Sequence, residues 1–126
     1  MRRVARLGDG WFPAANNPKF TISNPKELCQ RLDLLKNVCD EENRNFADLD
    51  IGFFFTEGVS SKERRNADGD RQLLTGQPSD IAADISKFND IGLDTLICIF
   101  QRPGLSETLE QMEWFGREII PLVREI

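Results

Sequence analysis

Histidine and tyrosine are absent from this chain of 126 residues. Without histidine, a single chain has neither a Ser-His-Asp triad nor an imidazole base, and without tyrosine it has no phenolic acid. Cysteine is scarce, and no metal-type spacing joins the three that occur, which are Cys29, Cys39 and Cys98. We therefore expect free thiols, buried or half-buried in a reducing compartment, and no metal site. The catalytic residues stay unknown at this stage.

Long apolar runs and an excess of positive charge are also lacking. No stretch reaches the ~18 apolar residues of a membrane span, and no apolar signal core follows Met1, Arg2 and Arg3. The net charge is −5, and the basic residues are scattered or in short clusters. A domain that binds nucleic acid usually has a broad basic face, so we expect no nucleic-acid binding. Since the sequence shows neither a membrane span nor a signal core, we also expect a cytoplasmic protein that does not bind membranes.

What the sequence does contain is an ordinary globular composition, with 40% hydrophobic and 29% charged residues. Residues 1–7 are typical of the end of a helix, which Gly8 is expected to terminate as a C′ glycine. A short apolar strand is predicted at residues 11–13. Because proline cannot donate a ladder hydrogen bond, we expect Pro13 to end that strand.

The strongest helix signal begins at Asn24. Asn24 is the expected N-cap, Pro25 takes the first helical position and Glu27 completes a capping box. Apolar residues then recur at steps of four, three and four, which predicts a buried face of Leu28, Leu32, Leu35 and Cys39, widened by Leu34 and Val38. We expect this helix to end near Asn43.

Two further strands are predicted from apolar runs. The unbroken run at residues 50–56 indicates a strand buried on both faces, as in parallel sheets, and a second all-apolar run covers residues 95–100. Between them, residues 57–75 form a polar segment without a sustained period. A loop of this length in a compact domain is usually functional or disordered.

Each of these strands is followed by a helix signal. The first helix opens at residues 76–80 and ends at Gly92, with a buried stripe of Ile81, Ile85 and Phe88. The second starts at Ser106 and has an apolar face of Leu109, Met112, Phe115, Ile119, Ile120 and Val123. Pro121 is expected to kink its last turn. Strands that alternate with helices predict right-handed crossovers and a parallel sheet, and three strands do not close a barrel.

Three segments carry motifs in a characteristic order: residues 4–13 (VARLGDGWFP), 73–85 (LLTGQPSDIAADI) and 91–97 (IGLDTLI). Together they resemble the bacterial-luciferase-like oxidoreductases, above all the branch that uses the deazaflavin F420, which commonly shows ARLGDGW, GTPEEVAEDI and AGVDHLVL. One motif alone is a weak signal, whereas three in register span nearly the whole chain. The chain departs from the pattern at Gln77, where threonine is common, and at Thr95, where histidine is common.

This resemblance implies an α/β fold that is a partial TIM (β/α)8 barrel. Residues 1–126 would be a single luciferase-like domain fragment made of the last three βα units with parallel strands, with the long loop 57–75 after the second of them. Complete barrels of this kind run to about 250 residues and place the active site at the carboxyl ends of their strands. The absent part would include the turn that holds the cofactor phosphate and the strands that usually carry the chemistry.

By the same resemblance, six residues at the carboxyl ends of the strands are predicted to bind F420 or FMN: Trp11, Phe12, Thr56, Glu57, Gln101 and Arg102. Arg102 is suited to hold a phosphate or carboxylate with two hydrogen bonds. The alternatives are that the two aromatic residues belong to the core or rim and that Arg102 is a solvated loop residue. Lys62, Arg64 and Arg65 could attract an anionic cofactor tail or simply be solvated.

The resemblance predicts a fragment of an F420- or flavin-dependent oxidoreductase or monooxygenase that is inactive alone. The alternative is a non-catalytic half-barrel module that self-associates or binds a partner, and a flavin-binding protein without turnover lies between the two. This chain by itself is expected to bind F420 or FMN weakly or not at all. Open sheet edges, and side chains such as Phe53 or Phe54 and Ile97 or Ile99 on a bare sheet face, predict a homodimer or other homo-oligomer.

Overall fold

The structure is a computed structural model, which describes residues 1–124. The chain divides into two compact units. The first unit comprises Met1–Phe55 and Ile91–Ile97, and the second comprises Thr56–Asp90 and the chain from Cys98 onward. No helix in the described part is long and apolar enough to cross a membrane.

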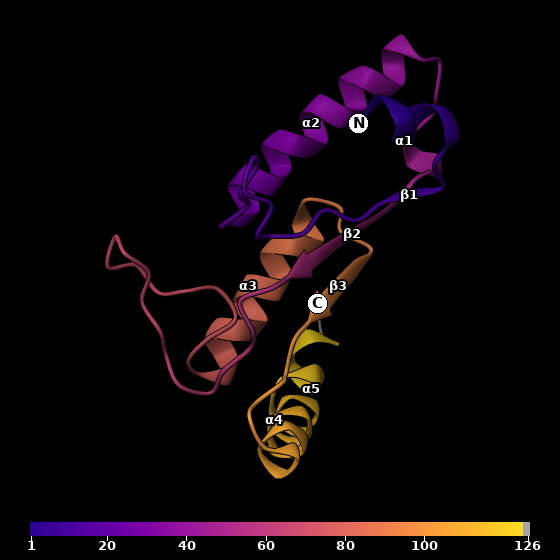
Figure 1. Ribbon diagram of the computed structural model, residues 1–126. Coiled ribbons are helices and arrows are strands. Elements are labelled where there is room, and N and C mark those ends of the chain that lie inside the picture. Colours follow the sequence, from indigo (N-terminus) through magenta and orange to yellow (C-terminus); the bar gives the residue numbers. More distant parts are fainter. Residues whose placement is uncertain (125–126) are drawn as a thin grey trace. The chain divides into compact units, whose positions relative to one another are not determined.

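The first unit is built on a three-stranded sheet with the strand order β1-β2-β3, whose neighbouring β1 and β2 are seen in Figure 1. Its elements are α1 (Arg2–Leu7), β1 (Gly10–Trp11), α2 (Pro25–Glu41), the 3₁₀ helix η1 (Phe46–Asp48), β2 (Asp50–Phe55) and residues 95–97 of β3 (Thr95–Cys98). β1 runs parallel to β2, with Gly10 opposite Asp50 and Trp11 opposite Ile51. The predicted α/β class with an open parallel sheet is confirmed, and its assignment to a TIM barrel stays a prediction.

The capping signals predicted for α2 are confirmed. The side chain of Asn24 accepts a hydrogen bond from the Glu27 amide at 2.9 Å, and the Glu27 carboxylate accepts one from the Ser23 amide at 2.6 Å. The predicted face is buried at Leu28, Leu32, Leu35 and Cys39. Leu34 does not widen it, because its direction on the helix leaves its side chain 48% exposed.

Strand β1 ends at Trp11, before Pro13, and pairing with β2 resumes beyond the proline as an isolated bridge between Ala14 and Phe54. The carbonyl oxygen of Pro13 accepts a hydrogen bond from the Phe54 amide at 2.9 Å, and the Ala15 amide donates to the Phe54 carbonyl at 2.9 Å. Proline lacks only the donor, so its acceptor still serves the ladder. β2 is buried at Gly52 and Phe53 and half-buried at Phe54, as its unbroken apolar run predicted.

Gly8 ends α1 as expected, but not through a left-handed conformation, since its φ is −89°. Glycine fits there because a Cβ would lie 3.0 Å from the Val4 carbonyl oxygen. At the other end of the first unit, Asp94 of the third motif fixes the start of β3. Its carboxylate accepts a hydrogen bond from the Ile51 amide at 2.7 Å, and its own amide donates to the Ile51 carbonyl at 2.8 Å.

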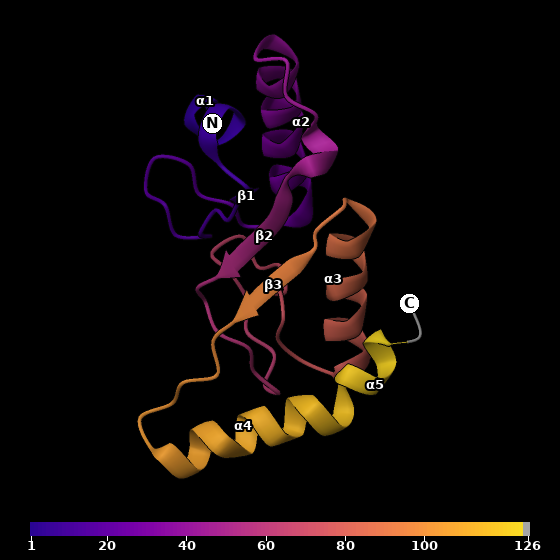
Figure 2. The ribbon, with the colours of Figure 1, turned by 90° about the vertical axis from the view of Figure 1, so that its right-hand side faces the viewer.

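The second unit contains three helices in its described part: α3 (Pro78–Asp90), α4 (Leu105–Glu118) and α5 (Ile120–Val123). Gly92, which follows α3 in the chain, has φ +90° and terminates that helix as predicted. α5 packs against α3, as Figure 2 shows. The expected kink is confirmed, because the chain breaks at Ile119 and α5 begins with Pro121 in its first turn.

Two apolar expectations were wrong in this region. The strand ends at Cys98 rather than Phe100, and its residues alternate between exposed and half-buried. The predicted face of α4 is buried only at Ile119, while Leu109 and Met112 are 54% and 50% exposed. Within residues 1–124, helix α4 itself has no buried residue. Among the described elements, α5 packs against its C-terminal end, and the ring of Phe100 contacts that of Phe115.

The three cysteines are free, and they are buried or half-buried as predicted. Burial raises the pKa of the Cys98 thiol to about 11, from an ordinary value of 9.0. The thiolate is the reactive form, so we expect Cys98 to be alkylated about a hundredfold more slowly near pH 8 in the native protein than after denaturation. Iodoacetamide labelling followed by peptide mass spectrometry measures this.

The same shift has a defined effect on stability. Between about pH 9 and pH 11 the unfolded state loses the Cys98 proton before the folded state does. The contribution of Cys98 to the free energy of unfolding is therefore fully present below pH 9 and lost as the pH rises through 11. Equal alkylation rates in the native and denatured protein would contradict the burial of this thiol.

Candidate functional site

The loop after β2 is organised by one buried carboxylate, that of Asp84 on α3. Its Oδ1 accepts a hydrogen bond from Arg71 Nη2 at 2.7 Å, and its Oδ2 accepts one from the Leu74 amide at 2.9 Å. The Asp84 side chain is 1% exposed and that of Arg71 is 22% exposed. The hydrogen bond with Asp84 raises the pKa of Arg71 above its already high ordinary value, so Arg71 keeps its positive charge.

This carboxylate also fixes an unusual backbone conformation. Leu74 has φ +58°, in the left-handed region that residues with a side chain seldom adopt. Arg71 Nη1 donates to the Thr75 carbonyl at 2.7 Å, so both residues of this turn are tied to the ion pair. The motif at residues 73–85 is therefore a structural lock in the second unit.

The two arms of the long loop are joined beyond this lock. The Ser60 amide donates to the Leu74 carbonyl at 3.1 Å, and the Gly76 amide donates to the Ser60 carbonyl at 3.0 Å. The Arg64 amide donates to the buried Thr75 hydroxyl at 3.2 Å. Residues 57–75 are thus an ordered loop, although they contain no helix and no named strand.

Arg102 joins this loop to the segment that follows β3. Its Nη2 donates to the Val59 carbonyl at 2.5 Å and to Gln111 Oε1 at 3.3 Å, while its Nη1 donates to the Gln101 carbonyl at 3.1 Å. The Val59 amide also donates to the Ile99 carbonyl at 3.0 Å. Since both terminal nitrogens of Arg102 serve the protein backbone, a two-pronged grip on a ligand would require these bonds to break.

The two joined segments line an open cleft of about 660 Å³, a volume within the range of small-molecule sites. Ten residues line it: Thr56, Glu57, Gly58, Ser60, Lys62, Glu63, Arg64, Ile99, Gln101 and Arg102. Four of the six residues predicted from the sequence are therefore brought together here. We refer to it as the loop cleft.

Some polar groups of the loop cleft form hydrogen bonds or ion pairs with other described residues, and at least one does not. The hydroxyl oxygen of Thr56 is buried, and no hydrogen-bond partner for it exists among the described residues. Glu57 accepts a hydrogen bond from Gln72 at 3.4 Å, and Glu63 pairs with Arg65 at 3.1 Å. The lining contains three basic side chains, Lys62, Arg64 and Arg102, against these two carboxylates, so the cleft can present positive charge to an anion.

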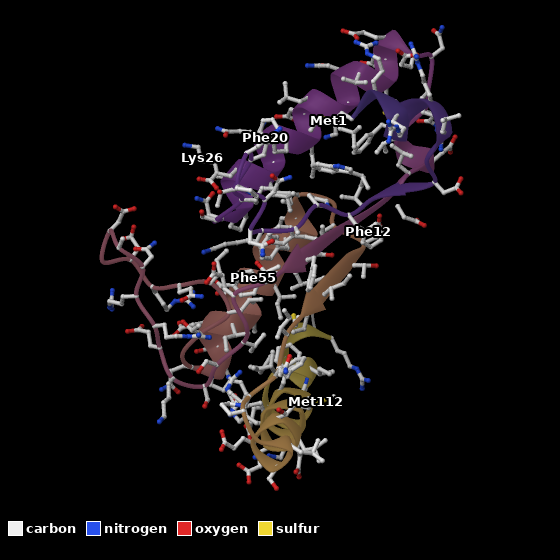
Figure 3. All side chains as sticks on the ribbon, viewed as in Figure 1. Met1, Phe12, Phe20, Lys26, Phe55 and Met112 are labelled. Carbon is white, nitrogen blue, oxygen red and sulfur yellow. The ribbon has the colours of Figure 1, made fainter. Side chains whose placement is uncertain are left out.

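The other two predicted site residues lie in the first unit. Trp11, at the end of β1, lines a separate cleft there. The ring of Phe12 lies over Gly52, where an added Cβ would come within 2.1 Å of two ring carbons, and its side chain is 48% exposed. Phe12 is labelled in Figure 3. Its ring position explains a glycine in the middle of a buried strand.

Sequence reasoning missed Asp84 as an organising residue. It assigned the buried stripe of α3 to Ile81, Ile85 and Phe88, but Ile85 is only half-buried and Asp84 is fully buried. Its position three residues after Ile81 places it on the buried face of the helix, and this spacing was the available signal. The lining residues Gly58 and Ser60 carried no comparable signal.

No group of three or more histidine, cysteine, aspartate or glutamate side chains within residues 1–124 is placed to hold a metal ion. No protein-family model matches the chain, and no curated protein matches it.

Proposed function

We propose that the chain is the C-terminal part of a luciferase-like oxidoreductase or monooxygenase that depends on F420 or a flavin. In this proposal the loop cleft receives the anionic tail of the cofactor, and the chain has no activity alone. The bound cofactor would supply the hydride transfer. The residues of this chain would bind and orient it.

The observation that carries the proposal is the meeting of Thr56, Glu57, Gln101 and Arg102 in one cleft. These four are among the six residues that the resemblance predicts to bind the cofactor. The open parallel sheet and the position of the cleft after β2 and β3 also agree with a site at the carboxyl ends of barrel strands. Cofactor binding by Trp11 and Phe12, which lie in the first unit, stays a prediction.

Within the cleft, Lys62 and Arg64 suit a phosphate or carboxylate. Arg64 Nη2 donates to the Gly58 carbonyl at 3.0 Å, which leaves the rest of its guanidinium group for a ligand. The buried hydroxyl of Thr56, which has no hydrogen-bond partner within residues 1–124, would donate to an anionic oxygen that displaced the atoms covering it. Arg102 would act by holding the two loops together, since its own donors are occupied.

Titration of the purified chain with FMN and with F420, followed by flavin or deazaflavin fluorescence, tests the proposed incompleteness of the site. We expect little bound cofactor at micromolar concentrations, because the loop cleft is open and its described lining has one large apolar side chain, Ile99, to contact the ring. Supplying the first five strand-helix units of a luciferase-like barrel as a separate chain should raise the affinity. Flavin retained in stoichiometric amounts by the chain alone would contradict the proposal.

A non-catalytic module that self-associates is the second candidate, and exposed apolar side chains favour it. In the second unit, Leu105, Leu109 and Met112 recur along one side of α4 and are 75%, 54% and 50% exposed. In the first unit, Ile97 is 42% exposed, as expected for a bare sheet face, whereas Phe53 is buried.

Light scattering at micromolar concentration tests this candidate. We expect a dimer that dissociates when Leu109 and Met112 are replaced by glutamate, since buried charge opposes association. A monomer at every concentration would eliminate self-association.

A further inference from the structure

The first unit contains a cleft that the proposed function does not use. Its volume is about 390 Å³, and it is formed by the segment that follows β1 together with α2. Apolar side chains make up most of its wall: Met1, Trp11, Pro13, Phe20, Ile22 and Leu34. We refer to it as the Arg31 cleft, after the one lining residue with a charged side chain.

The guanidinium group of Arg31 lies against an aromatic ring of this wall. Its central carbon is 4.6 Å from the centroid of the Phe20 ring, a cation–π distance. No carboxylate in residues 1–124 forms an ion pair with Arg31, and no acidic residue lines the cleft. Arg31 therefore supplies the one charged side chain among the lining residues, and the ring contact orients it.

The apolar wall is unusually open to water for side chains of its kind. Phe20 is 52% exposed, Leu34 is 48% exposed and Met1 is 38% exposed. Met1 and Phe20 are labelled beside α2 in Figure 3. Leu34 was expected to belong to the buried face of α2, but its side chain lines the cleft instead. Gathered apolar side chains around a concave surface are typical of binding sites.

We propose that the Arg31 cleft binds a small monocarboxylic acid with an aromatic or aliphatic body. The carboxylate would accept hydrogen bonds from the Arg31 guanidinium group, whose fork geometry matches it. The body would lie on Trp11, Phe20 and Leu34. A single charged side chain in a mostly apolar cleft matches a ligand with one negative charge better than it matches a polyphosphate.

Octanoate is a suitable probe, with the uncharged 1-octanol as its matched comparison. The chain has two tryptophans, Trp11 and Trp114. In a Trp114→Phe variant the indole fluorescence reports on Trp11 alone, which lines the cleft. We expect octanoate to bind at least about tenfold more tightly than octanol, because only octanoate gains the charge-assisted hydrogen bonds.

Substitution of the arginine separates charge recognition from apolar contact. Arg31→Gln should weaken octanoate binding by about tenfold and leave octanol binding unchanged. Lys26→Gln, which removes an exposed charge from the same helix, should change neither. Circular dichroism of each variant checks that it is folded.

Equal affinity of the parent protein for octanoate and octanol would overturn the proposal without any need for a variant, as would the absence of octanoate binding. Unchanged octanoate affinity in Arg31→Gln would overturn it as well. These outcomes are independent of the proposed function, since the titrations with FMN and F420 concern the loop cleft in the second unit.

Discussion

Replacing Asp84 by alanine is expected to lower the free energy of unfolding by about 3 kcal/mol. The substitution leaves the amide of buried Leu74 without its acceptor and removes the partner of Arg71. It also releases the left-handed backbone of Leu74, which the carboxylate holds in place. Urea unfolding followed by circular dichroism measures the change.

Two further variants make this prediction specific. Asp84→Asn keeps an oxygen for the Leu74 amide and loses the charge pair, so we expect a smaller loss than for alanine. Asp90→Ala removes an exposed carboxylate from the end of the same helix and should change the free energy of unfolding by less than about 0.5 kcal/mol. If Asp84→Ala is no more destabilising than Asp90→Ala, the long loop is not held by this residue.

Leu35→Ala is expected to cost about 3 kcal/mol of stability, whereas Leu34→Ala should cost little. These neighbours on α2 have the same side chain and opposite environments, with Leu35 0% and Leu34 48% exposed. The cost at Leu35 combines the lost burial of three side-chain carbon atoms with the cavity that remains. The pair thus measures the buried face of α2 with helix propensity held constant.

Urea unfolding of both variants provides the test. Equal effects at the two positions would show that the helix presents a different face to the core. A large loss of stability for Leu34→Ala alone would also show a different buried face. It would further mean that Leu34 packs in the core and does not line the Arg31 cleft.

Local signals predicted much of the fold. The start of α2 at Asn24 and Pro25 and the end of α3 before Gly92 depend on caps and backbone preferences within a few residues. Strand β2 was recognisable because its apolar run is unbroken. In each case the residues that determine the element lie inside it or within two residues of its end.

Features that depend on distant partners were not predicted. The burial of Asp84 requires Arg71, thirteen residues earlier, and a sequence pattern does not reveal that partnership. The exposure of Leu109 and Met112 depends on which elements pack against α4, and an apolar stripe predicts a buried face whether or not one exists. Arg102 was predicted to bind the cofactor and lines the loop cleft, but its bonds to Val59 and Gln101 give it a structural role.

The most direct test of the central claim is to map FMN on the chain by amide chemical-shift changes in nitrogen-15 NMR spectra at millimolar concentration, with riboflavin as the control without phosphate. The account predicts weak binding whose largest shifts fall on Thr56, Arg64 and Gln101 and which riboflavin does not reproduce. Shifts spread over both units, identical shifts with riboflavin, or no shifts at all would contradict a cofactor-tail site in the loop cleft.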